Sequence, residues 1–152
     1  ILFRDAERVV ISDFGIAKDL RIDSELTQDG IVVGSPAYSS PEQAQCLAVD
    51  ARTDLYSLGV MLYQMLAGVA PFRGESMATL MYKIANVPHD SVFDARPELA
   101  TTLPGIGAVI DKALAKDPEH RFQTGQEFAT ALKACVDASH QAHSAPGLEI
   151  EE

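Results

Sequence analysis

The most apolar part of this 152-residue chain is the stretch from Asp50 to Gly68, which reads DARTDLYSLGVMLYQMLAG. From Leu55 onward its apolar side chains fall on every side of a 3.6-residue repeat, which is typical of a buried helix. Polar residues interrupt the run, and it is shorter than the roughly 30 Å that a membrane core requires. The pattern predicts a central helix surrounded by other elements, with Pro71 ending the helical path.

An acidic residue, Asp54, stands where this helix is expected to start. A carboxylate at that position meets the positive end of the helix dipole and can accept hydrogen bonds from free backbone N–H groups. An N-terminal cap is therefore one interpretation of Asp54.

Three further helices are predicted after the central one. Ser76 can cap a helix that runs to about Val87, and apolar residues recur at helical spacing from Ile106 to Leu114. Thr124 and Glu127 have the spacing of a capping box, and an amphipathic pattern follows them. The residues from Pro88 to Pro104 are expected to form a polar connection.

The N-terminal part has a different pattern. Two short apolar runs, at 1–3 and 9–11, are separated by charged residues, which predicts a small β-hairpin. Residues 18–34 are polar and show neither helical nor strand periodicity, and a loop of this length is uncommon in a compact domain unless it is functional. The expected fold is mainly α with a short β-hairpin.

Composition narrows the class of protein. The apolar fraction of 47% and the charged fraction of 22% are those of a globular domain, and the formal charge of −10 argues against a nucleic-acid-binding surface. The two cysteines, Cys46 and Cys135, lack the spacing of a zinc site or of a disulfide framework, which fits a reducing cytoplasm. No membrane span or signal peptide is recognised, and the chain opens without Met, so we expect it to be part of a longer protein.

Several short motifs follow one another in a definite order. Asp-Phe-Gly at 13–15 follows the second predicted strand, and GSPAYSSPE at 34–42 ends the polar loop. Each motif alone is weak, but together with the central apolar stretch they resemble the eukaryotic-like serine/threonine protein kinases of bacteria, with SPE where the family has APE. The resemblance covers residues 1 to about 138.

The resemblance implies a protein-kinase-like fold of which this chain forms the large, C-terminal lobe only. Residues 1–138 would be that part of the kinase domain: a hairpin over 1–12, an activation segment over 13–42 and a helical subdomain over 43–138. Residues 139–152 are expected to be a disordered tail or linker, on their polar composition.

The same resemblance assigns roles to residues of the first segments. Asp13 would be the Mg²⁺ ligand, Leu2 and Ser12 would border the ATP site, and the hydroxyl of Ser35 would bond to the catalytic base. A plain core position is the alternative for Leu2. The residues implied to have the remaining roles in the activation segment are Phe14 and Gly15 (loop conformation), Gly34, Pro36, Ala37 and Tyr38 (substrate pocket) and Thr27, with Ser24 as the second candidate (activating phosphorylation).

Two implied roles connect the activation segment to the helices. Glu42 and Arg121 are expected to meet as a buried ion pair, and Asp54 is expected to clamp the backbone of the catalytic loop, a role that competes with simple capping.

The chain contains no Gly-rich loop, no phosphate-binding Lys and no HRD motif. The resemblance therefore implies that this chain is part of an ATP- and Mg²⁺-dependent serine/threonine kinase that acts on proteins. The chain alone is expected to be inactive. The expected partners are protein substrates, ATP and a second kinase molecule for autophosphorylation, without nucleic acid. We expect a cytoplasmic location, with any membrane tether of the parent outside this chain. The alternative is a pseudokinase or a non-catalytic docking module.

Overall fold

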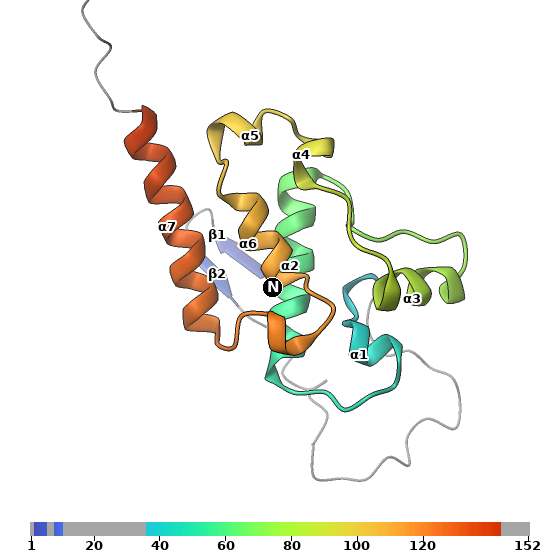
Figure 1. Cartoon of the computed structure of the whole chain (residues 1–152). Helices are drawn as coiled ribbons and strands as arrows, with labels where there is room; N and C mark the ends of the chain where they lie inside the picture. The colour runs from blue at the N-terminus through green and yellow to red at the C-terminus, as the bar shows by residue number, and fades with distance from the viewer. Residues whose placement is uncertain (1, 6–7, 11–35, 144–152) are drawn as a thin grey trace, which may run out of the picture. The chain divides into compact units, whose positions relative to one another are not determined.

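The computed structural model describes residues 2–5, 8–10 and 36–143, and the chain separates into two units, Ile1–Ser35 and Pro36–Glu152 (Figure 1). In the first unit, β1 (Leu2–Asp5) and β2 (Arg8–Val10) pair antiparallel, with Leu2 opposite Val10 and an irregularity before Asp5. The two strands overlap the two apolar runs of the sequence, each displaced by about one residue.

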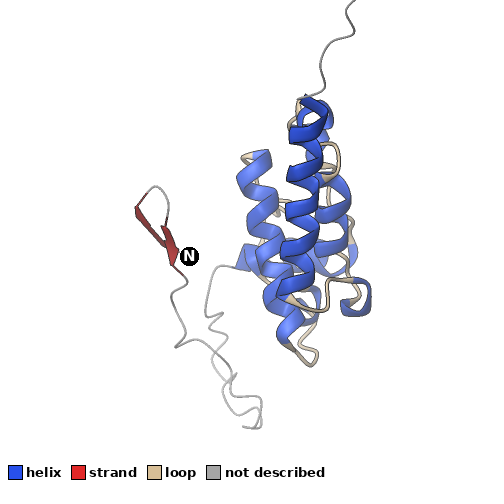
Figure 2. Cartoon of the chain, turned by 90° about the vertical axis from the view of Figure 1, so that its left-hand side faces the viewer, coloured by secondary structure: helices blue, strands red, loops and turns tan. Residues whose placement is uncertain are grey.

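The described part of the second unit is helical (Figure 2). Its elements in chain order are η2 (Pro36–Tyr38), α1 (Pro41–Ala44), α2 (Ala51–Ala67), α3 (Met77–Asn86), α4 (Val92–Ala95), α5 (Leu99–Thr102), α6 (Ile106–Ala113), η3 (Pro118–His120) and α7 (Gly125–His143). None of the helices described is long and apolar enough to cross a membrane.

The central helix, α2, starts earlier and ends earlier than the sequence pattern predicts. Asp50 is its N-cap, because the Asp50 carboxylate accepts a hydrogen bond of 2.8 Å from the backbone N–H of Arg52. The capping interpretation of Asp54 is therefore wrong: Asp54 lies in the first turn and is exposed. At the other end Gly68 has a φ of +74°, which favours glycine, and stops the helix before Pro71 is reached.

One face of α2 is buried, rather than its whole circumference. The buried positions are Thr53, Tyr56, Gly59, Val60, Tyr63 and Ala67. Leu58 is 39% exposed and Met65 is 73% exposed on the remaining surface. The expectation of a helix surrounded on all sides is corrected, because α6, α4 and η2 all pack along α2 without covering these two side chains.

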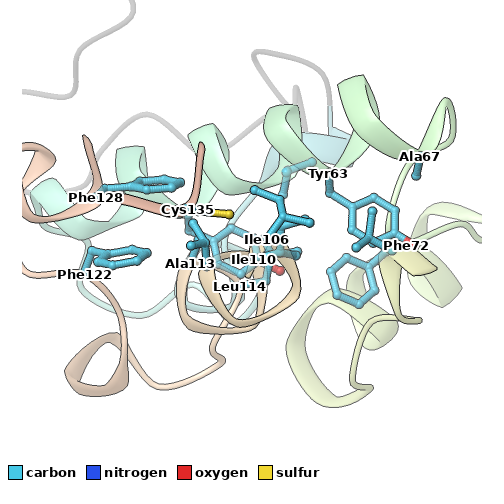
Figure 3. Packing of buried hydrophobic residues seen from close by; sticks show 14 of the residues in the cluster. Tyr63, Ala67, Phe72, Ile106, Ile110, Ala113, Leu114, Phe122, Phe128 and Cys135 are labelled. Carbon is cyan, nitrogen blue, oxygen red and sulfur yellow. The ribbon is translucent and has the colours of Figure 1, made fainter. Parts of the chain in front are cut away.

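The core forms where α2 and α6 approach closely (Figure 3). A Cβ atom at Gly59 would lie 2.8 Å from the Cβ atom of Ala113, so glycine is what lets the two helices come together. The buried apolar cluster comprises Tyr56, Val60, Tyr63, Ala67, Phe72, Ile84, Val92, Ile106, Val109, Ile110, Ala113, Leu114, Phe122, Phe128 and Cys135.

The predicted cap of α3 is confirmed, since the Ser76 side chain accepts a hydrogen bond from the backbone N–H of Thr79. The polar connection of residues 88–104 is wrong in part. It contains α4 and α5, and α4 buries Val92 at 1% exposure. Each of these helices has only four residues, which is too short for a helical repeat to be visible in the sequence.

The last helix starts as the capping pattern indicates and runs further than expected. The Thr124 hydroxyl accepts a hydrogen bond of 3.1 Å from the backbone N–H of Glu127, and the Glu127 carboxylate accepts one from the N–H of Gln123 rather than of Thr124. The helix extends to His143, so the predicted boundary of a disordered tail at 138 falls inside α7. Residues 144–152 of the predicted tail lie outside the described residues.

Candidate functional site

The short η2 helix is fixed on α2 by two hydrogen bonds. The Tyr38 hydroxyl donates to Oε1 of Gln64 over 2.7 Å, and the Ser57 hydroxyl donates to the Tyr38 carbonyl over 2.8 Å. Ser57 and Gln64 lie two helical turns apart on α2. Pro36, Ala37 and Tyr38, three of the predicted substrate-pocket residues, are therefore held along the side of the central helix.

The start of α1 is a reciprocal capping box that the sequence interpretation missed. The Ser40 hydroxyl accepts from the backbone N–H of Gln43, and the Gln43 side chain accepts from the N–H of Ser40 over 2.9 Å. Ser40 is fully buried, and Pro41 occupies the first helical position. The Ser-Pro-Glu-Gln tetrapeptide was the available signal for this cap.

Glu42, the next residue of α1, meets Arg121 across 79 positions of sequence. Nη1 of Arg121 donates to Oε1 of Glu42 over 2.8 Å and Nη2 donates to Oε2 over 2.7 Å, which is the bidentate geometry of a strong ion pair. The Thr53 hydroxyl of α2 also donates to Oε1 over 2.7 Å. The Glu42 carboxylate therefore joins α1 both to α2 and to the loop after η3.

The Arg121 guanidinium has further partners, and its side chain is fully buried. Its Nε donates to the carbonyl of Ala115 over 2.7 Å and Nη2 donates to that of Lys116 over 2.9 Å. The ring of Tyr56 lies 4.8 Å from the guanidinium carbon, a cation–π contact. A charge that is out of contact with water is thereby satisfied entirely by protein groups.

The environment of Glu42 shifts its protonation strongly. Burial alone would raise the pKa of the carboxyl, but the hydrogen bonds from Arg121 and Thr53 stabilise the charged form more and lower its pKa to about 2. Glu42 is therefore ionised at every physiological pH, and at these pH values its contact with Arg121 is an ion pair.

A second group of charges, at the start of α2, is more exposed and simpler. Arg52 forms ion pairs with Asp50 at 2.7 Å and with Glu119 at 2.8 Å, and both acids are open to solvent. These pairs link the start of α2 to η3 at the surface, where each is worth little.

Most of the residues predicted for the chemistry lie outside the described residues: Ser12, Asp13, Phe14, Gly15, Ser24, Thr27, Gly34 and Ser35. The backbone of Leu2 lies in β1. Asp54 is exposed on α2, and the role of clamping a catalytic loop stays a prediction. Within the described ranges, no group of three His, Cys, Asp or Glu side chains could hold a metal ion, and Cys46 and Cys135 are free thiols.

The sequence and the fold of this chain are similar to those of known proteins. Residues 1–133 match the protein kinase domain family. A "probable serine/threonine-protein kinase" of Streptomyces coelicolor is 41% identical over 133 residues, which are 86% of this chain and 19% of the relative. The serine/threonine-protein kinase PknB of Mycobacterium leprae is 39% identical over 132 residues, or 87% of this chain and 21% of the relative.

Among solved structures, the twitchin kinase region from C. elegans matches with a TM-score of 0.55 and 25% identity, over 66% of this chain and 17% of that one. The chain therefore belongs to the protein kinase family, and its similar proteins include serine/threonine kinases of bacteria. It spans about a fifth of the length of these curated relatives.

Proposed function

We propose that this chain is the part of an ATP-dependent serine/threonine protein kinase that presents the activation segment and the protein substrate. The observation that supports this most is the buried Glu42–Arg121 pair, which ties α1, where the segment 13–42 ends, to the loop after η3. A rigid attachment at this end is what positioning of a hydroxyl substrate requires, since phosphoryl transfer depends on orientation and charge neutralisation.

The residues before the described helices supply the remaining chemistry in this proposal. Asp13 offers a carboxylate, the oxygen ligand that Mg²⁺ prefers, and Leu2 and Ser12 would border the nucleotide. Bound Mg²⁺ and ATP would supply the transferred phosphoryl group and its charge neutralisation. Ser35 would orient the catalytic base, Phe14 and Gly15 would set the loop conformation, and Gly34 would complete the substrate pocket with η2.

Phosphate transfer by the full-length parent protein tests the proposal. With Mg²⁺ and ATP it should label myelin basic protein on serine and threonine, and Asp13→Asn should abolish labelling because it removes one ligand charge. Asp137→Asn, at an exposed position of α7, is the matched control and should keep full activity. An inactive parent whose upstream region lacks the catalytic Asp would instead establish the pseudokinase or docking module.

The 152-residue chain alone should not phosphorylate myelin basic protein or casein. It contains no HRD motif and no phosphate-binding Lys, so it has no group to position the acceptor hydroxyl and the phosphates. Phosphate incorporation by the purified chain at a rate near that of the parent would contradict this.

Thr27 is the proposed activating phosphosite, with Ser24 next. Its position in the middle of the segment 13–42 supports this, because a phosphate there adds charge and acceptor oxygens that can order a loop around a cation such as Lys18. Autophosphorylation, in which one kinase molecule modifies another, would add this phosphate to Thr27. Mass spectrometry of the parent should find phosphate on Thr27, and Thr27→Ala should slow the parent; an unmodified Thr27 and an undiminished rate would remove it from the mechanism.

The remaining proposals concern the setting of the parent. We propose a cytoplasmic kinase domain, with any membrane tether of the parent outside these residues, because Cys46 and Cys135 are free thiols, as is usual in a reducing compartment. Fractionation of cells that express the tagged parent, with protease accessibility of the kinase domain, would test it.

A further inference from the structure

A cavity of about 420 Å³ lies beside the C-terminal end of α2, away from the Glu42–Arg121 pair. Its apolar lining includes Tyr63, Pro71, Phe72 and Val87, and it lies between the loop after α2, the end of α3 and α4. The volume is within the range of sites that bind small ligands or single side chains of a partner.

Four charged residues also line this cavity. Arg73 comes from the loop after α2 and Lys83 from α3, while Asp90 precedes α4 and Asp94 lies within it. In the part of the chain that the structure describes, none of the four forms an ion pair. This is unlike Arg52 and Arg121, which both have carboxylate partners.

Tyr63, which forms the floor of the cavity, carries a phenol group close to the same charges. Tyr63 is 2% exposed, and its ring packs edge-on against His89 at 5.8 Å between centroids. Burial raises the pKa of the Tyr63 phenol, the carboxylates of Asp90 and Asp94 raise it further, and the Arg73 guanidinium acts in the opposite direction. The phenol is thus neutral and can donate a hydrogen bond, and charges of both signs lie near it.

The charges select the kind of occupant. A simple anion would meet two carboxylates and a simple cation would meet two cationic groups, so each is attracted and repelled at once. A ligand with an apolar body and one charge of each sign matches the lining, and a peptide segment has this character when an apolar residue lies between a basic and an acidic one. Nucleic acid does not match, because Asp90 and Asp94 would face its phosphates.

The location favours a segment of the protein substrate. Gln64, which bonds to Tyr38 of η2, directly follows Tyr63 of the cavity floor. Ser57, the other anchor of η2, lies six residues before Tyr63, a rise on the order of 10 Å along the helix. An extended peptide covers such a distance with a few residues at about 3.3 Å each.

We propose that this cavity is a docking site for a segment of the protein substrate in which an apolar side chain lies between a basic and an acidic residue. The site is separate from the phosphoacceptor position, and the inference rests on the proposed kinase function. Docking there would raise the local concentration of the acceptor hydroxyl near η2.

Synthetic peptides and the full-length parent test this proposal. Each long peptide carries one acceptor Ser and an Arg-Leu-Glu segment at a different distance from it, and a short peptide carries the Ser alone. We expect one spacing to give the lowest KM. The Arg73→Glu, Lys83→Glu double variant should raise that KM by about five- to tenfold without changing kcat, since partly exposed charge contacts each contribute only modestly to binding.

Two controls make the outcome decisive. The short peptide should be phosphorylated equally by both proteins, and Lys133→Glu, at an exposed position of α7, should change neither peptide's KM. Equal KM values for all spacings, or the same KM in wild type and double variant, would overturn the docking site.

Binding of fluorescent versions of the same peptides, read by anisotropy, separates this inference from the kinase function. A peptide that binds wild type more tightly than the double variant supports the docking site even where no phosphate is transferred. A lack of phosphate transfer together with equal binding by both proteins would count against both proposals.

Discussion

The two ends of α2 use charge in opposite ways. At the N-terminal end, Glu42 and Arg121 are buried, bonded to each other and bonded to surrounding groups at distances of 2.7–2.9 Å. At the C-terminal end, Lys83 and Asp94 line an open cavity and form no ion pair within the described residues. A buried charge with every partner in place fixes one structure, whereas a charge without a partner at a cavity is available to a ligand.

The comparison predicts its largest effect at the buried end. Arg121→Met should lower the free energy of unfolding of the 152-residue chain by about 3–5 kcal/mol, because it leaves the Glu42 carboxylate buried without its counterion. Arg52→Met, which breaks only exposed pairs, is the control and should cost much less than Arg121→Met. Urea unfolding measures both, and equal losses would remove the distinction between buried and exposed pairs.

Acid should weaken the same end. The pKa of Glu42 is lowered from 4.5 to about 2 in the folded chain, so its contribution is fully present above pH 4.5 and is lost as the pH falls toward 2. The difference corresponds to about 3 kcal/mol. Glu42→Gln should flatten the stability curve between these pH values, while the exposed Glu75→Gln should leave it steep. A parallel curve for Glu42→Gln would show that another group causes the acid sensitivity.

Between the two ends, the close approach of α2 and α6 should be sensitive to a single methyl group. Gly59→Ala forces a contact of 2.8 Å with Ala113, and overpacking of this kind costs about 1–3 kcal/mol, partly offset by the better helix propensity of Ala. Gly125→Ala is the control, because its nearest neighbour, Leu55, would be at an ordinary 3.9 Å. Thermal unfolding measures both variants. An equal decrease of the Tm in both would argue against a special contact at Gly59.

The smallest effect is expected at the cavity. Lys83→Glu and Asp94→Lys should each change the free energy of unfolding by no more than about 1 kcal/mol, since each reverses only a charge at a helix end and has no ion pair to lose within the described part of the chain. Loss of stability comparable to that of Arg121→Met would mean that these charges hold the fold.

The sequence predicted the helices whose apolar residues repeat over several turns. It did not predict the exact ends of α2 or the two short helices α4 and α5. The existence of α2, α3, α6 and α7 follows from periodicity. The ends of α2 depend instead on the caps Asp50 and Gly68, whereas the sequence pattern predicted a start at Asp54 and an end at Pro71. The helices α4 and α5 are too short to show a period.

The candidate site also combines predicted and unpredicted contacts. Nothing local connects Glu42 with Arg121 across 79 positions, and only the resemblance to protein kinases suggested that they meet. Thr53 and Tyr56, which complete the environment of this pair, were not predicted, because their contacts exist only once α2 is packed. The cavity at the other end draws its lining from several segments between Tyr63 and Ala95, and these meet only once α2, α3 and α4 are packed.

A double-mutant cycle between Glu42 and Arg121 tests most directly whether this pair attaches α1, at the end of the proposed activation segment, to the loop after η3. The free energy of unfolding is measured for wild type, Glu42→Gln, Arg121→Met and the double variant. A direct buried pair predicts that the double variant is less destabilised than the sum of the single variants, by about 2–3 kcal/mol. Single losses that add to within about 0.5 kcal/mol would contradict the attachment.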